Sequence, residues 1–395
     1  MRSWLTYIFL LMVACGTVLT SCSDVLSEEG LGTCDDRAPV RLTISFGESS
    51  PMSRDVAPDT NGAVPGLDPT TNLQKAMDAD DVYLLVFNAQ TGLLEYQVKD
   101  LSLSNPANDD YNTRTLSGTM LATGTGKTVK LVVLANLSQN NITVTLKNST
   151  SLALNNKTNV QAFIDDMIGE DQTTIYEKLI YNYNVTNNGT EGIWNISNRR
   201  IPMWGITAAT QVPSTGTTLD CYLYRAVAKV QIWVNQLAEE KGIEGFVINK
   251  IEVKNIHNKG YCVSTESYDE NSSNYANGAK PYAAPSVPNE PGTQTVTYGS
   301  DEQPLNVTQT YSDEIYIPER FNTDGNAVTI DVHYTFNGEA HTGTIEFKKD
   351  GTGKRFDVIR NHSYIFNINI SRTDAKLYYT VEDWDEYTIN IPAFE

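Results

Sequence analysis

The most regular feature of the chain is an alternation of apolar and polar residues, the pattern of β-strands with one buried face. Between residues 40 and 46 every second residue is apolar, so the first predicted strand buries Val40, Leu42, Ile44 and Phe46. Residues 82–87 and 129–135 are apolar at almost every position. Such runs are typical of central strands that are covered on both faces.

Further strands are expected in the second half of the chain. The pattern predicts them at residues 221–234, 246–256, 294–297, 328–336, 341–347, 362–370 and 377–391. The dipeptide Asn337-Gly338 lies between two of these strands and is a strong signal for a two-residue hairpin turn. The register of that hairpin places Tyr334 opposite His341, and His333 opposite Thr342.

One segment has helical spacing instead. Its apolar residues predict a short amphipathic helix that buries Val160, Phe163, Ile164, Met167 and Ile168. Many short strands with one or two short helices indicate an all-β fold, built as two β-sandwiches in series. We expect the N-terminal sandwich over residues 55–215 and the C-terminal sandwich over residues 216–395.

The first residues have the layout of a secretory signal peptide. A basic start at Arg2 precedes an apolar run over residues 4–19, which is too short for a membrane-spanning helix. The segment Leu19-Thr20-Ser21-Cys22 resembles a bacterial lipobox. This resemblance implies that residues 1–21 are removed and that acyl chains on Cys22 attach the mature protein to the outer membrane.

Composition narrows the range of partners. A chain of 395 residues is long enough for two domains, and its net charge of -19 argues against binding to nucleic acid or to anionic lipid. Three of the five cysteines remain after signal removal and lipidation. Of these, Cys221 and Cys262 form either a disulfide or two buried thiols.

Motifs that suggest chemistry are each incomplete. Residues 123–128 resemble a phosphate-binding loop, but Leu121 stands where that loop needs glycine, and a strand follows. His333 and His341 fall on opposite faces of their hairpin, so one metal ion cannot bind both. Asp78-Ala79-Asp80-Asp81 lacks the spacing of an EF-hand and predicts an acidic turn. We expect no cofactor, no metal and no enzymatic activity.

Several short segments along nearly the whole chain form a joint pattern. They are the lipobox at Cys22, the strand 42–46 followed by Ser53-Arg54, and the segments 82–87, 127–136, 201–205, 224–230, 360–364 and 380–384. With these segments the chain resembles the fimbrillins, the subunits of the type V pili of Bacteroidia. The resemblance implies two transthyretin-like sandwich domains and export as a lipoprotein.

The resemblance also implies an Arg-specific protease as a partner, which cuts the loop after the first strand in polymerising members. Arg54 matches that position, so residues 22–54 would form a pro-segment. Its removal would empty a groove that had held four apolar side chains, at a cost on the order of 6–12 kcal/mol. The loss would also expose two strand edges.

A strand from another subunit would remove both penalties. The alternating C-terminus is the candidate donor, through Tyr387, Ile389, Ile391 and Phe394. Because groove and donor lie on different surfaces, such a contact propagates as a filament. The other interpretation of this tail is an ordinary last strand that pairs within its own domain.

These observations favour a stalk subunit of a cell-surface fimbrium that binds other fimbrial subunits and supports adhesion. An unprocessed anchor is the alternative, because Cys34 and the acidic residues around it precede the first strand as in anchor lipoproteins. A tip subunit is also left open. A different class is a surface lipoprotein that binds glycan through Trp194 or Trp204, although tryptophan in a sandwich is more often core.

Overall fold

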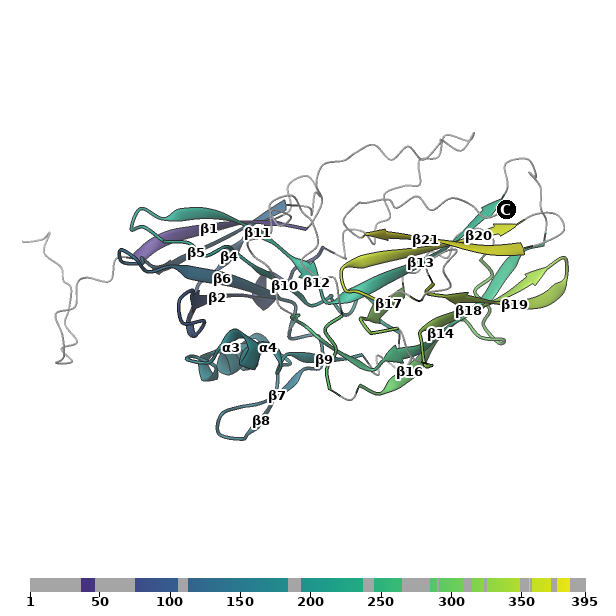
Figure 1. The fold of residues 1–395 in the computed structure, drawn as a ribbon, viewed down its shortest axis with the longest axis horizontal. Helices are drawn as coiled ribbons and strands as arrows, with labels where there is room; N and C mark the ends of the chain where they lie inside the picture. Colours follow the sequence, from purple (N-terminus) through teal and green to yellow (C-terminus); the bar gives the residue numbers. More distant parts are fainter. Residues whose placement is uncertain are drawn as a thin grey trace, which may run out of the picture. The chain divides into compact units, whose positions relative to one another are not determined.

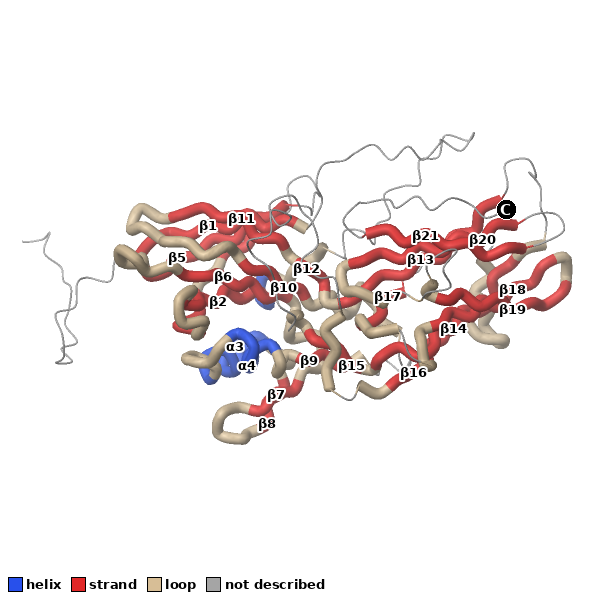
Figure 2. Tube along the Cα trace, viewed as in Figure 1, coloured by secondary structure: helices blue, strands red, loops and turns tan. Residues whose placement is uncertain are grey.

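The computed structural model describes residues 37–46, 75–105, 113–183, 193–236, 245–264, 285–289, 291–307, 315–322, 325–348, 355, 357–370 and 375–383. Within these ranges strands predominate, and two α-helices are present (Figures 1 and 2). The fold is all-β and sandwich-like, as the sequence predicted. No helix among the described residues is long and apolar enough to cross a membrane.

Two larger sheets contain most of the strands before residue 226. One has the order β11-β1-β5-β4, made of β1 (Arg37–Ser45), β4 (Ser102–Leu103), β5 (Thr113–Leu121) and β11 (Thr217–Tyr222). The other has the order β12-β10-β6-β2-β3, made of β2 (Val82–Asn88), β3 (Leu94–Val98), β6 (Val129–Ala135), β10 (Met203–Ile206) and β12 (Tyr224–Arg225). A short 3-10 turn, η1 (Ala79–Asp81), leads into β2 where the acidic turn was expected.

A small insertion covers the second of these sheets. It consists of β7 (Thr143–Thr145), β8 (Ser151–Ala153), α3 (Lys157–Asp166) and α4 (Gln172–Tyr176). In Figure 1 these helices lie on one side of β2 and β6, and the sheet with β1 lies on the other. This position explains why β2 and β6 are apolar on both faces: they form a middle layer.

Helix α3 begins at an Asn156 cap, whose side chain accepts a hydrogen bond from the Asn159 amide. Val160, Phe163 and Ile164 are buried as predicted. The expectation for Ile168 was wrong, because the helix ends at Asp166 and Ile168 lies beyond it with 41% of its surface exposed.

Two further sheets contain most of the remaining strands. One has the order β17-β13-β20-β21, made of β13 (Val227–Gln236), β17 (Ile315–Pro318), β20 (His362–Ile370) and β21 (Ala375–Asp383). The other has the order β16-β14-β18-β19, made of β14 (Val247–His257), β16 (Thr293–Tyr298), β18 (Thr329–Phe336) and β19 (Glu339–Glu346). A small sheet pairs β9 (Ile180–Asn182) with β15 (Lys259–Tyr261).

The β18–β19 hairpin has the predicted register. Tyr334 lies opposite His341, and His333 lies opposite Thr342. Asn337 and Gly338 have φ values of 50° and 84°. Both lie in the left-handed region that a tight hairpin turn requires, so the expectation is confirmed.

The single strand expected over residues 221–234 was wrong. The chain forms β11, β12 and β13 there, with breaks at Leu223 and Ala226, because it passes from one sheet to the next. β11 pairs with β1, whereas the expected C-terminal domain began at residue 216. The boundary between two domains stays a prediction, and this pairing favours placing it nearer residue 226.

Candidate functional site

The candidate site is the groove that contains β1. This strand is internal to its sheet, since it pairs in parallel with β11 and antiparallel with β5. Val40 lies between Thr217 and Gly118, and Leu42 lies between Leu219 and Leu116. The backbone of β1 therefore joins two strands that would otherwise both end as open edges.

Alternate side chains of β1 complete the core. The inward residues each have at most 1% of their surface exposed; they are Ala38, Val40, Leu42, Ile44 and Phe46. Arg37, Pro39 and Arg41 lie on the other face and are exposed. The four larger inward side chains contribute about 6–12 kcal/mol of apolar burial, which is comparable to the whole stability of a typical domain.

Gly216 fits the groove to the backbone of β1. It stands just before β11 with φ +92°, and a Cβ atom there would lie 2.5 Å from the Pro39 carbonyl oxygen. Any side chain at this position would push β1 away. Sequence reasoning missed Gly216, because only the parallel pairing of β1 with β11 reveals the close approach.

The far end of the groove is closed by Phe46 and Arg225. The Arg225 guanidinium carbon lies 5.7 Å from the centroid of the Phe46 ring, and both side chains are buried. Two residues earlier, the Leu223 amide donates to the Ser45 carbonyl at 2.9 Å. The segment 224–230 was noted in the sequence, but nothing there indicated contact with β1.

The two described cysteines are both free and buried, which decides between the alternatives left open by the sequence. Cys221 lies on β11 opposite Ile44 of β1. Burial raises the pKa of the Cys221 thiol to about 12, and Cys262 is affected in the same way. Such thiols are protonated and unreactive at neutral pH.

The other predicted site residues lie outside the described residues. These are Cys22, Arg54, and the candidate donor residues Tyr387, Ile389, Ile391 and Phe394. Their roles in lipidation, processing and strand donation stay predictions.

Glycan stacking on Trp194 or Trp204 is contradicted. Each has 2% of its surface exposed, and Trp204 packs between Tyr176 and Tyr224. Trp194 packs against Tyr181, while the Arg199 guanidinium lies 3.7 Å from its ring centroid. Both are core side chains, as tryptophan in a sandwich usually is.

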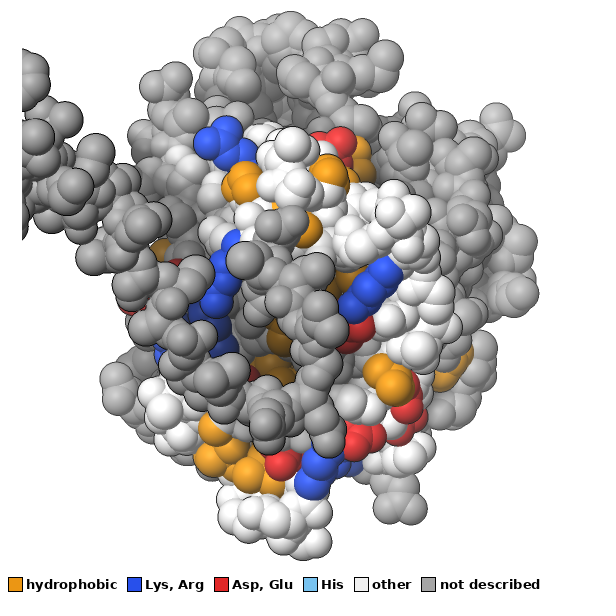
Figure 3. All heavy atoms as spheres, turned by 90° about the vertical axis from the view of Figure 1, so that its left-hand side faces the viewer, with side chains coloured by type: hydrophobic (Ala, Val, Ile, Leu, Met, Phe, Trp, Pro, Cys, Tyr) orange, Lys and Arg blue, Asp and Glu red, His pale blue; other side chains and the backbone are white. Residues whose placement is uncertain are grey.

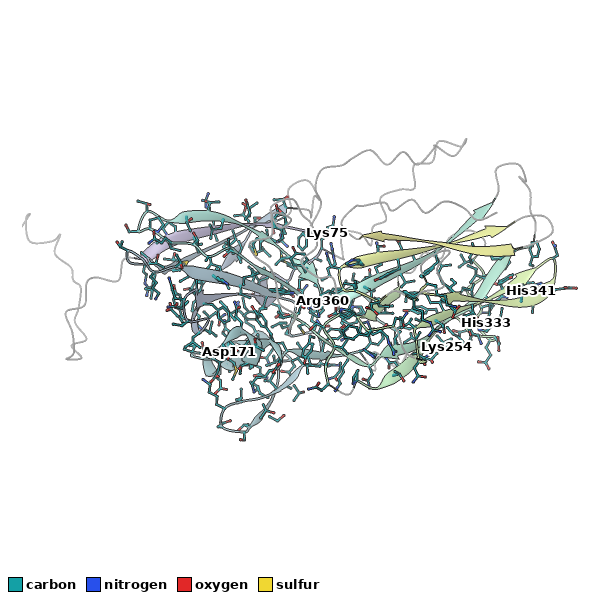
Figure 4. All side chains as sticks on the ribbon, viewed as in Figure 1. Lys75, Asp171, Lys254, His333, His341 and Arg360 are labelled. Atoms are coloured by element: carbon teal, nitrogen blue, oxygen red, sulfur yellow. The ribbon has the colours of Figure 1, made fainter. Side chains whose placement is uncertain are left out.

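The outer face of β14, β18 and β19 carries paired polar and charged side chains. His333 lies 3.2 Å from Glu252, and Lys254 pairs with Asp331, along the strands shown in Figure 4. Burial alone would raise the pKa of Asp331, but hydrogen bonds from Lys254 and Thr344 lower it below the ordinary value. Among the described residues no group of three His, Cys, Asp or Glu could bind a metal ion.

One face of the described residues is mixed in character. On the face shown in Figure 3, apolar side chains form small groups between charged and other polar ones. The most organised feature is therefore internal: a first strand, paired on both sides, that completes the core of its own chain.

Comparison with known proteins identifies the family. Residues 68–390 match the family described as fimbrillin-A associated anchor proteins Mfa1 and Mfa2, and the chain belongs to this family. No curated protein matches the sequence.

Fimbrial proteins are among the solved structures that are similar to the chain. The tip fimbrial protein Mfa3 from Porphyromonas gingivalis has a TM-score of 0.50 and 13% identity, covering 88% of this chain and 100% of that one. A fimbrial assembly protein from Parabacteroides distasonis has a TM-score of 0.45 and 12% identity, covering 88% and 95%. At these identities the first similarity supports the fold alone.

The family confirms the fimbrillin resemblance and fixes the general function. By its family, the chain is a structural protein of the cell-surface fimbrium, it acts with other fimbrial subunits, and it is not an enzyme.

Proposed function

We propose that this chain is an anchor-type fimbrial subunit that reaches the outer membrane as a lipoprotein and keeps β1 in its own groove. The observation that carries the proposal is the match of residues 68–390 to a family described as anchor proteins. In the intact chain β1 is paired on both sides and buried along one face, which is the state that an anchor would keep. The sequence alone favoured a stalk subunit, which becomes the second candidate.

A filled groove limits what the subunit can do. It has no place for a strand from a neighbour, so it can take part in strand exchange only as a donor. The donor would be the C-terminal tail with Tyr387, Ile389, Ile391 and Phe394. A subunit that donates but does not accept ends a polymer, and acylated Cys22 would attach that end to the outer membrane.

Substitution of Arg54 separates the two candidates. In Arg54→Lys the charge is kept but an Arg-specific protease has no arginine to cut. The anchor proposal predicts that cells with this variant carry attached fimbriae in normal number and length by electron microscopy. Loss of fimbriae in Arg54→Lys would contradict it. Cys22→Ala is the matched control, because loss of acylation should release fimbriae into the medium.

The second candidate, a polymerising stalk subunit, is favoured by the place of Arg54. It lies eight residues after Phe46, so a cut there would remove the whole of β1 with the leader. For this candidate, an Arg-specific protease should convert the purified chain into SDS-resistant ladders in unheated gels. Deletion of the last ten residues should abolish those ladders.

A further inference from the structure

Segments that lie far apart in the sequence meet around residues 223–227. The Leu223 amide donates to Ser45 on β1, and the Ala226 amide donates to Pro202, each at 2.9 Å. Arg225 and Tyr224 pair with Met203 and Trp204 on β10. The short stretch of chain between β11 and β13 is thus bonded to β1 at its start.

The same stretch is bonded to the beginning of β20 at its other end. The Asn361 amide donates to the Val227 carbonyl at 2.9 Å. In the opposite direction, the Asn361 side-chain oxygen accepts from the Arg225 amide at 3.2 Å and from Arg225 Nη1 at 3.1 Å. Asn361 has φ +56°, so these bonds stabilise a backbone conformation that few residues adopt.

The buried Arg225 guanidinium therefore contacts Phe46, just after β1, and Asn361, just before β20. The face of the Phe46 ring lies on one side of it and the Asn361 side-chain oxygen Oδ1 on another. A buried guanidinium needs contacts of this kind, because they offset the loss of its hydration. Displacing Phe46 would change the surroundings of a charge that also orients Asn361.

The residue before Asn361 makes the turn rigid on its other side. Arg360, labelled in Figure 4, is fully buried. It pairs with Glu319, with Arg360 Nε 2.8 Å from Glu319 Oε1. It also donates to the carbonyl oxygens of Tyr261 and Cys262. Because this side of the turn is bonded independently of β1, a change at Phe46 should act through Arg225 and Asn361.

We infer that Arg225 couples the occupancy of the β1 groove to the stability of β20. With Phe46 in place, the Arg225 guanidinium is fixed and the turn at Asn361 is ordered. When β1 leaves, Arg225 loses the aromatic ring, Leu223 loses the bond to Ser45, and the start of β20 opens more often. The inference rests on the proposed role of β1 as the strand that fills the groove.

The coupling has a consequence for assembly. β20 is the neighbour of β21, the last described strand before the candidate donor tail. A subunit with a filled groove would keep this sheet closed, and a subunit that has lost β1 would open it more readily. The occupancy of the β1 groove and the opening of the sheet that precedes the C-terminal tail would then affect each other within one chain.

The test is hydrogen exchange measured by mass spectrometry on the intact, uncut chain. Phe46→Leu keeps an apolar side chain but removes the ring, and Ile44→Val is the matched control on the same face of β1. We expect Phe46→Leu to speed exchange in peptides of residues 362–370 about 3- to 30-fold more than Ile44→Val does. Peptides from β14 and β18 should change equally in both variants.

Arg225→Met provides the second arm. In the Arg225→Met background, Phe46→Leu should speed exchange in residues 362–370 no more than Ile44→Val does, because the coupling side chain is absent. Equal effects of the two β1 variants with Arg225 present, or a Phe46→Leu effect that persists in Arg225→Met, would overturn the inference. The chain stays uncut in this test, so neither result bears on whether the subunit is an anchor or a stalk. The Arg54→Lys experiment decides that assignment.

Discussion

Ile44 of β1 is the cross-strand partner of Cys221 on β11. Both side chains are fully buried, and the thiol stays protonated because burial raises its pKa to about 12. β1 thus lies directly beside a thiol whose reactivity can be measured.

The first prediction uses that thiol as a reporter of β1. Ile44→Ala should leave a cavity beside Cys221 and let β1 open more often, since such truncations cost about 2–5 kcal/mol. Maleimide labelling of Cys221 at pH 8, followed by peptide mass spectrometry, should become at least about tenfold faster. Cys262, buried away from β1, is the internal control. Equal acceleration at both cysteines would indicate global unfolding and contradict the prediction.

The second prediction concerns the energetic weight of β1. Leu42→Ala removes a buried side chain between Leu116 and Leu219 and should lower the free energy of unfolding by about 2–5 kcal/mol. Arg41→Ala, its exposed neighbour, should change that free energy by no more than about 0.5 kcal/mol. Urea denaturation measures both. A similar small effect for the two variants would mean that β1 contributes little to the core.

A third prediction tests the close approach of β11 to β1. Gly216→Ala and Gly338→Ala both place a side chain at a positive φ, which by itself costs about 1 kcal/mol. Only at Gly216 would the new Cβ collide with β1, because nothing lies within 4 Å of the position at Gly338. The fall in thermal midpoint should therefore be clearly larger for Gly216→Ala. Equal falls would show that the backbone of β1 is not fitted to Gly216.

The fourth prediction concerns alkaline pH. Burial raises the pKa values of Cys221 and Cys262 to about 12, above the unfolded value of about 8.5. The folded chain then retains protons that the unfolded chain loses. Stability is intact below about pH 8.5 and declines as pH rises toward 12, by about 1.4 kcal/mol per pH unit for each thiol.

Urea titrations between pH 8 and 10 test this slope. Cys221→Ala should remove about half of the decline in this window, and the double variant with Cys262→Ala should remove most of it. An unchanged slope in the double variant would assign the decline to other groups.

Local pattern predicted local structure well. The alternation over residues 40–46 predicted which face of β1 is buried, and Asn337-Gly338 predicted both a turn and its register. In each case the residues that give the sequence pattern are the same residues that form the predicted structure. Helix α3 was predicted for the same reason, apart from Ile168 beyond its end.

Non-local relationships could not be predicted. Nothing in residues 217–222 indicates that they pair in parallel with β1, which lies far away in the sequence. The breaks at Leu223 and Ala226 arise because the chain passes from one sheet to the next there. The apolar pattern continues across both breaks, so it predicted a single strand. The contacts of Arg225 with Phe46 and Asn361 depend on three distant segments, and no single segment encodes them.

The central claim is that β1 remains in the groove of its own chain on the cell surface. The most direct test is the N-terminal residue of the protein recovered with native fimbriae, determined by mass spectrometry of the terminal peptide. The account predicts acylated Cys22, with β1 still covalently attached. A chain that begins at Asp55 would have lost β1 and would contradict it.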